Sequence, residues 1–177
     1  MEQVCVYFRG HHIYNLEDMS LLDSLPNKQQ KTLYKHLEAL GQNYVIKLAV
    51  MDFSQPLRNT VYALFPEAAI TINPEDVMAM MRSYLGYDLG LGNVEEEIAA
   101  SVEREVLAYR EAEIIYPDIY SYETKQVAIY NYKQWQSCVP LGIKCFHHVI
   151  RTIDFYHQEV FNYFEFKGTI DRIYKKR

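Results

Sequence analysis

The most constraining segment of this chain is the run YVIKLAVM at residues 44–51. It is almost continuously apolar but only about eight residues long, which is typical of a strand buried on both faces. Helical periodicity at 23–41 precedes it, and Gly41 is predicted to end that helix. Another helix is predicted from Ser54 through Phe65, and AAITI at 68–72 predicts a short strand. This alternation predicts a sheet with parallel neighbours and covering helices.

The segments on either side of this block have different characters. VCVYF at 4–8 and IYNL at 13–16 predict a hairpin around Gly10. Beyond Gly92 the pattern becomes mostly helical, with helices expected near residues 93–116, 122–138 and 142–166. We therefore predict an α/β fold of the mixed α+β kind, with a mixed sheet and flanking helices at 1–92. A helical portion at 93–177 is expected to pack on it in one compact domain.

Composition excludes several classes of protein. The chain has 177 residues, with 18 Lys and Arg against 23 Asp and Glu, a formal net charge of −5. No apolar run approaches the ~20 residues that cross a bilayer, so no membrane association is expected. The three cysteines, Cys5, Cys138 and Cys145, form no CxxC pair, which argues against a disulfide framework or a zinc ribbon. A cytoplasmic location fits these features best.

Asp52 is the first candidate for chemistry. It follows the strand at 44–51, and the carboxyl ends of strands are where open α/β sheets place their ligands. Two-metal phosphoryl-transfer sites need two or three such oxygen ligands from different elements. Judged from the residues alone, Asp52 more simply begins the turn toward the helix at Ser54.

Basic and aromatic residues provide a weaker signal for binding. The C-terminal segment from residue 167 carries five basic residues against Asp171, and such a cluster either contacts phosphates or is only solvated. They are Lys167, Arg172, Lys175, Lys176 and Arg177. Sixteen tyrosines suit nucleobase stacking or a protein interface, or else line the boundary of a modest core.

Several blocks together resemble a known family. MDFS at 51–54 and FPEA at 65–68 stand within the helix, strand, helix, strand block, and IIYPDIYSYETK and FHHVIRTIDFYHQEVFNYFEFKGTI follow in the helical half. From residue 23 to 177 the chain resembles the RNase H-like catalytic domain of bacterial insertion-sequence transposases of the DDE type. The resemblance implies an RNase H-like mixed sheet and, in active members, Mg²⁺-dependent DNA strand transfer or nicking.

The resemblance also assigns the acidic residues. Asp52 stands at the second acid of the triad and would be the metal ligand. The opening strand offers only Glu2 for the first acid. The position expected for the final acid falls near Tyr174, and Glu165 serves only in a shifted alignment. Asn73 begins a plain helix start where the family carries "aspartate, arginine, phenylalanine, histidine".

Loss of two of three metal ligands would abolish strand transfer, because the metals supply the nucleophile and stabilise the leaving oxygen. With these departures, the resemblance implies a truncated, degenerate transposase-derived domain that is inactive in DNA transposition and needs no cofactor. If a metal site survives, Asp52 would bind Mg²⁺ with Glu165 or Glu2. Weak DNA contact through the basic segment is one expected partnership. The alternative is a protein-interaction or oligomerisation module, a homo-oligomer for example, built on the helical, tyrosine-rich half.

Overall fold

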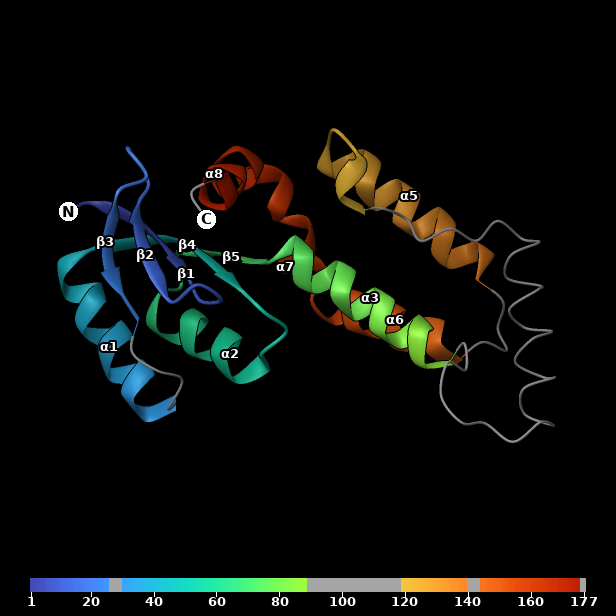
Figure 1. The fold of residues 1–177 in the computed structure, drawn as a ribbon, viewed down its shortest axis with the longest axis horizontal. Helices are drawn as coiled ribbons and strands as arrows, with labels where there is room; N and C mark the ends of the chain where they lie inside the picture. The colour runs from blue at the N-terminus through green and yellow to red at the C-terminus, as the bar shows by residue number, and fades with distance from the viewer. Residues whose placement is uncertain (26–29, 89–118, 140–143, 176–177) are drawn as a thin grey trace. The chain divides into compact units, whose positions relative to one another are not determined.

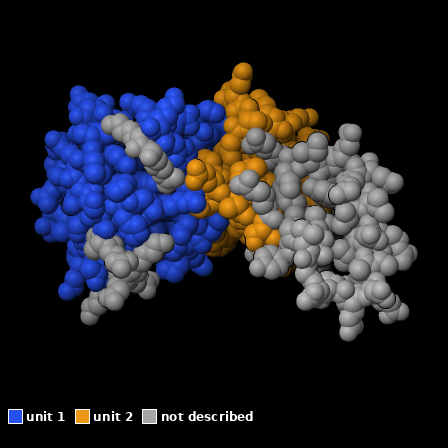
Figure 2. All heavy atoms as spheres, viewed as in Figure 1, with its two compact units in different colours: residues 1–73, 158–177 blue, residues 74–157 orange. Residues whose placement is uncertain are grey.

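The computed structural model describes residues 1–25, 30–88, 119–139 and 144–175. The chain forms two compact units (Figure 2), of which the first contains residues 1–73 and 158–177 and the second contains residues 74–157. The first unit is therefore built from two separate stretches of sequence. The predicted boundary at residue 92 and the predicted helix near 93–116 lie outside the described residues.

The first unit is organised around a five-stranded mixed sheet. Its strands are β1 (Gln3–Tyr7), β2 (His12–Asn15), β3 (Leu21–Ser24), β4 (Val45–Met51) and β5 (Ala69–Ile72), in the order β3-β2-β1-β4-β5. The β2 strand pairs antiparallel to β1 and β3, whereas β1, β4 and β5 run parallel. The fold class predicted from the sequence, a mixed α+β fold with a mixed sheet in the first half and a helical second half, is confirmed.

Two helices each precede one of the parallel strands. They are α1 (Gln30–Asn43), before β4, and α2 (Gln55–Leu64), before β5, and they lie on one side of the sheet (Figure 1). Ser54 caps α2, since its hydroxyl accepts a hydrogen bond from the Leu57 N–H at 3.4 Å. The prediction that Gly41 ends its helix is wrong, because α1 continues to Asn43. Gly41 instead allows close packing of the two helices, as a Cβ there would lie 2.7 Å from the Phe65 ring.

The core of the first unit lies along the central strands. Every residue of β1 from Val4 to Tyr7 and of β4 from Leu48 to Met51 is buried. The run at 44–51 is therefore a strand covered on both faces, as its nearly continuous apolar pattern predicts. The outer strand β3 is mostly exposed, with Leu21 56% accessible. The strand has only four residues, and such a short edge strand limits backbone pairing with strands of other chains.

The described part of the second unit is helical. It contains α3 (Pro74–Asp88), the short 3-10 helix η1 (Ile119–Ser121), α5 (Lys125–Cys138) and α6 (Lys144–Phe155), and α3 packs along α6. Tyr132 and Trp135 of α5 form an aromatic cluster with Phe146. The Tyr132 hydroxyl donates to Asp154 Oδ1 at 2.9 Å. Burial is the main cause of the raised Tyr132 pKa, and the Asp154 charge adds to it.

The C-terminal helical segment differs from the single helix expected near 142–166. It is interrupted at Tyr156 and Asn162 and forms α6, then α7 (His157–Phe161), then α8 (Tyr163–Lys175). The apolar spacing alone could not reveal these breaks, because side chains on either side keep helical spacing. The second break coincides with a buried hydrogen bond from the Asn162 side chain to the Ile70 carbonyl of β5, at 2.9 Å.

Two helical glycines give a matched test of this packing. Gly168 of α8 has open space around it, so Gly168→Ala should raise the free energy of unfolding by about 0.5–1 kcal/mol through helix propensity alone. Gly41→Ala gains the same propensity but places a Cβ against the Phe65 ring. We expect it to lower the stability, as measured by urea unfolding. Equal stabilisation by both substitutions would contradict the observed α1–α2 packing.

Candidate functional site

The carboxyl ends of the three parallel strands define the candidate site. Because β1, β4 and β5 run in the same direction, Tyr7, Met51 and Ile72 end at the same edge of the sheet. Asp52 follows β4 at this edge and its side chain is exposed. Asn73 follows β5, and its backbone N–H donates to the Met51 carbonyl at 2.9 Å. Open α/β sheets bind ligands at such an edge.

Three uncharged side chains are joined by hydrogen bonds at this edge, and we refer to Tyr7, Asn73 and Tyr174 as the Tyr–Asn–Tyr cluster. Asn73 is fully buried and its Nδ2 donates to the Tyr7 hydroxyl at 3.4 Å. The Tyr174 hydroxyl, from α8, donates to Asn73 Oδ1. The two tyrosine rings meet edge to face, with centroids 6.4 Å apart. The cluster thereby links β1, the end of β5 and the last helix.

The structure does not bring Glu2 to Asp52. Glu2 precedes β1, and its carbonyl accepts a hydrogen bond from Val45 N–H, at the start of β4. Asp52 lies past the other end of β4. At about 3.3 Å per residue, the length of the strand separates the two positions by roughly 20 Å. The two carboxylates therefore lie at opposite edges of the sheet and cannot share one metal ion.

Glu165 is also separated from the candidate site. It lies exposed in the first turn of α8. Tyr174, which reaches the cluster, is nine residues further along the same helix, or roughly 13 Å along its axis. Within residues 1–25, 30–88, 119–139 and 144–175, no group of three or more His, Cys, Asp or Glu side chains could hold a metal ion. Asp52 thus has neither predicted partner beside it.

Of the predicted nucleic-acid-binding residues, Lys167, Arg172 and Lys175 are exposed on α8. The Lys167 ammonium lies 5.5 Å from the centroid of the Tyr163 ring. Arg172 Nε donates back to the Gly168 carbonyl at 3.3 Å. Lys176 and Arg177 lie outside the described residues. Nucleic-acid binding by this segment stays a prediction.

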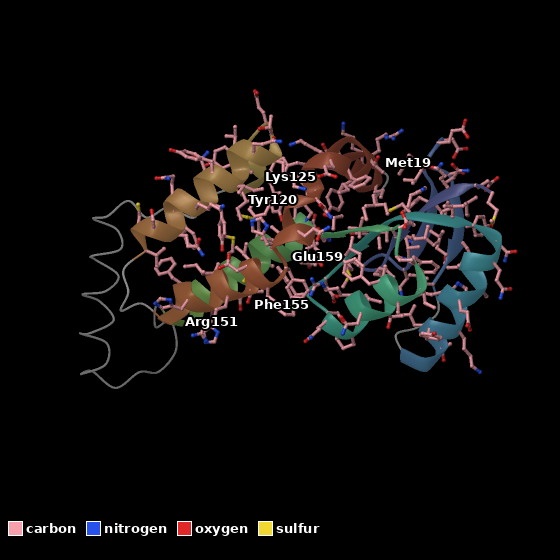
Figure 3. All side chains as sticks on the ribbon, turned by 180° about the vertical axis from the view of Figure 1, so that it is seen from behind. Met19, Tyr120, Lys125, Arg151, Phe155 and Glu159 are labelled. Carbon is pink, nitrogen blue, oxygen red and sulfur yellow. The ribbon has the colours of Figure 1, made fainter. Side chains whose placement is uncertain are left out.

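A second polar cluster joins α2 to α7. Glu159, labelled in Figure 3, is fully buried. Its Oε1 accepts hydrogen bonds from Arg58 Nε and from the Tyr62 hydroxyl, the latter at 2.9 Å. Burial raises the pKa of Tyr62, and the Glu159 carboxylate raises it further. Burial would lower the pKa of Arg58, but the hydrogen bond and charge of Glu159 outweigh it, so that pKa lies above its ordinary value.

Sequence reasoning did not identify the buried polar contacts of Tyr7 and Asn73 in the first cluster, or those of Glu159 in the second. Tyr7 belonged to an apolar strand pattern, and Asn73 matched the cap of the following helix. Glu159 precedes Val160 in a segment whose apolar residues recur at helical spacing. No local pattern signals that Glu159 meets Arg58, because 101 residues separate them. Two signals in the sequence do point to this edge, namely Asp52 after the buried strand and the position near Tyr174 expected for a final acid.

Comparison with protein-family models, curated proteins and solved structures finds no match to this chain. The strand order and directions are therefore the basis of the fold description, and a shared fold alone does not define an activity. In the part of the chain that the structure describes, no helix has the length and apolar character needed to cross a membrane.

The Arg58–Glu159 pair should be strongly coupled to stability. Arg58→Met would leave a fully buried carboxylate without its cation, and we expect a loss of about 3–5 kcal/mol in the free energy of unfolding at neutral pH. The double variant Arg58→Met, Glu159→Met removes both charges and should recover most of that loss. Denaturant unfolding of the wild type, the single variants Arg58→Met and Glu159→Met, and the double variant measures the coupling.

Arg172→Met is the control for this cycle, since Arg172 is an exposed arginine of the same unit. It should change stability by no more than about 0.5 kcal/mol. A double variant as unstable as Arg58→Met would show that the apolar replacements fail to pack, and would contradict the role given to the buried charge.

Proposed function

We propose that this chain is an RNase H-like domain related to DDE-type insertion-sequence transposases that does not carry out metal-dependent DNA strand transfer. The observation that carries the proposal is the Tyr–Asn–Tyr cluster at the carboxyl edge of the sheet. The edge where this fold would need converging carboxylates holds hydrogen-bonded, uncharged side chains.

The placement of three positions supports the relationship. The resemblance expects acids on the opening strand, at Asp52, and near Tyr174. The carboxyl end of β1 lies beside β4, since Tyr7 pairs with Val50 and Phe8 N–H donates to the Val50 carbonyl at 2.9 Å. Tyr174 contacts Tyr7 from α8. Positions far apart in the sequence thus converge at one edge, and Asp52 is the acid retained among them.

The chemistry of the side chains supports the loss of activity. Two-metal strand transfer requires ligands that hold two cations about 4 Å apart and stabilise the attacking and leaving oxygens. A tyrosine hydroxyl and a carboxamide are neutral at pH 7, and both groups are already engaged with one another in the cluster. One exposed carboxylate offers too few ligands and too little charge to hold two Mg²⁺ ions.

Exposed apolar residues on α5 do not favour a second function. Val127 and Tyr130 are 46% and 63% accessible. Two such side chains are ordinary on a protein surface and fall well short of the contiguous patch that marks an interface. The oligomerisation alternative stays a prediction.

Thermal unfolding in the presence of Mg²⁺ or Mn²⁺ tests the proposal. A specific metal at a hundredfold excess over its Kd stabilises a folded protein by about 2.7 kcal/mol, enough to move the midpoint visibly. We expect no such shift for the wild type, and the same result for Asp52→Asn. A wild-type shift that disappears in Asp52→Asn would mean that a working metal site survives at this edge.

The double variant Tyr7→Asp, Tyr174→Glu provides a positive control. It places two more carboxylates next to the edge at which Asp52 lies. If these positions correspond to the missing acids, Mn²⁺ should raise the midpoint of this variant but not that of the wild type. The substitutions cost the hydrogen bonds to Asn73, so the comparison is made between each protein with and without metal.

A further inference from the structure

The last helix, α8, is attached to the sheet at its two ends by different contacts. At its start, Asn162 is buried and donates from Nδ2 to the Ile70 carbonyl of β5 at 2.9 Å. The Glu165 N–H donates to the Asn162 carbonyl at 3.0 Å, an i to i−3 bond that begins α8 after the break. The chain is therefore fixed to the sheet at the point where its helical direction is interrupted.

At the far end, Tyr174 provides the polar attachment. Its hydroxyl donates to Asn73, which is fully buried, and its ring meets the buried Tyr7 ring edge to face. Tyr174 itself is half-buried. Between the two ends, Tyr163, Ile170 and Ile173 supply the buried apolar contacts of α8.

The helix between these attachments has little stability of its own. It has 13 residues, and isolated helices of this length are marginal in water. Gly168 lies exposed in its middle, where glycine is the residue least favourable to a helix apart from proline. The formation of α8 thus depends on its docking, and loss of the Tyr174 contact favours release of the whole helix.

We propose that α8 is a hinged cover of the sheet, with Asn162 as its pivot and the Tyr174–Asn73 contact as its latch. Opening releases α8 beyond the pivot while the sheet stays folded. It uncovers the buried Asn73 and Tyr7 side chains at the same edge as Asp52. The device follows from the contacts of α8 and does not depend on whether the edge once bound metal.

Hydrogen–deuterium exchange on the full chain tests this device, because it separates local opening from global unfolding. In the wild type, the amides of residues 163–175 should exchange at least tenfold faster than those of β4. Tyr174→Phe removes the latch hydroxyl and keeps the ring. It should accelerate exchange across α8 by about five- to tenfold and leave β4 unchanged.

Tyr163→Phe is the matched control. It also removes one hydroxyl from α8, but that hydroxyl donates to Asp171 within the same helix, at 3.1 Å. It should change α8 exchange by less than twofold. Gly168→Ala should slow α8 exchange by about two- to fivefold, since the opened helix must unfold for its amides to exchange.

The outcomes separate a cover from an ordinary part of the core. If Tyr174→Phe accelerates α8 and β4 by the same factor, α8 opens only with the whole unit and the proposal is wrong. Equal effects of Tyr174→Phe and Tyr163→Phe on α8 exchange would also overturn it. The Tyr174 hydroxyl would then contribute no more to the docking of α8 than a hydroxyl that bonds within the helix. Selective acceleration of α8 by Tyr174→Phe alone supports the hinged cover.

Discussion

The parallel pairing of β1 with β4 is the constraint on which the rest of the first unit depends. It joins residues about forty positions apart in the sequence. The first pair is Gln3 with Val45 and the last is Tyr7 with Val50. The hairpin of β2 and β3 must then lie on one side of β1, and β5 on the far side of β4. The pairing also brings the carboxyl ends of both strands together. A candidate site at Asp52 thus exists because of this pairing, and Glu2 is excluded from it for the same reason.

Buried polar residues concentrate where the chain passes between its two units. In the described part of the chain, the buried polar or charged side chains are Thr71, Asn73, Glu159 and Asn162. The first unit ends at Asn73 and resumes at Gln158, and we call these two points, where the chain passes from one unit to the other, the crossings. All four residues lie within five positions of one of them. Apolar packing is non-directional, whereas a buried hydrogen bond is satisfied in one register only. The polar contacts of Asn73 and Asn162 thus specify the path of both crossing segments against the sheet.

Much of this architecture could be predicted from local patterns, and the exceptions have physical causes. The strand at 44–51 followed from its length and apolar continuity, and the Ser54 cap from its residue type and position. The continuation of α1 past Gly41 could not be predicted in this way, because the packing of the Phe65 ring against Gly41 is a tertiary contact. The Arg58–Glu159 pair and the Tyr–Asn–Tyr cluster join elements distant in sequence. Periodicity reports which face of an element is buried, but not which polar group meets it there.

The Tyr–Asn–Tyr cluster also gives a physical reason why an edge of this kind can persist without metal. Converging carboxylates repel one another and lose hydration when they are held together, so they need cations to be stable in their ionised form. Under the proposed function, loss of one acid weakens cation binding and leaves the remaining charges uncompensated. Neutral side chains that are hydrogen-bonded to one another remove this charge repulsion, and through Tyr174 they also attach α8 to the sheet. The same substitutions would then increase stability and remove catalytic ability. This agrees with the common trade-off between stability and activity. Asp52 is tolerated in this arrangement because it is exposed and keeps its hydration.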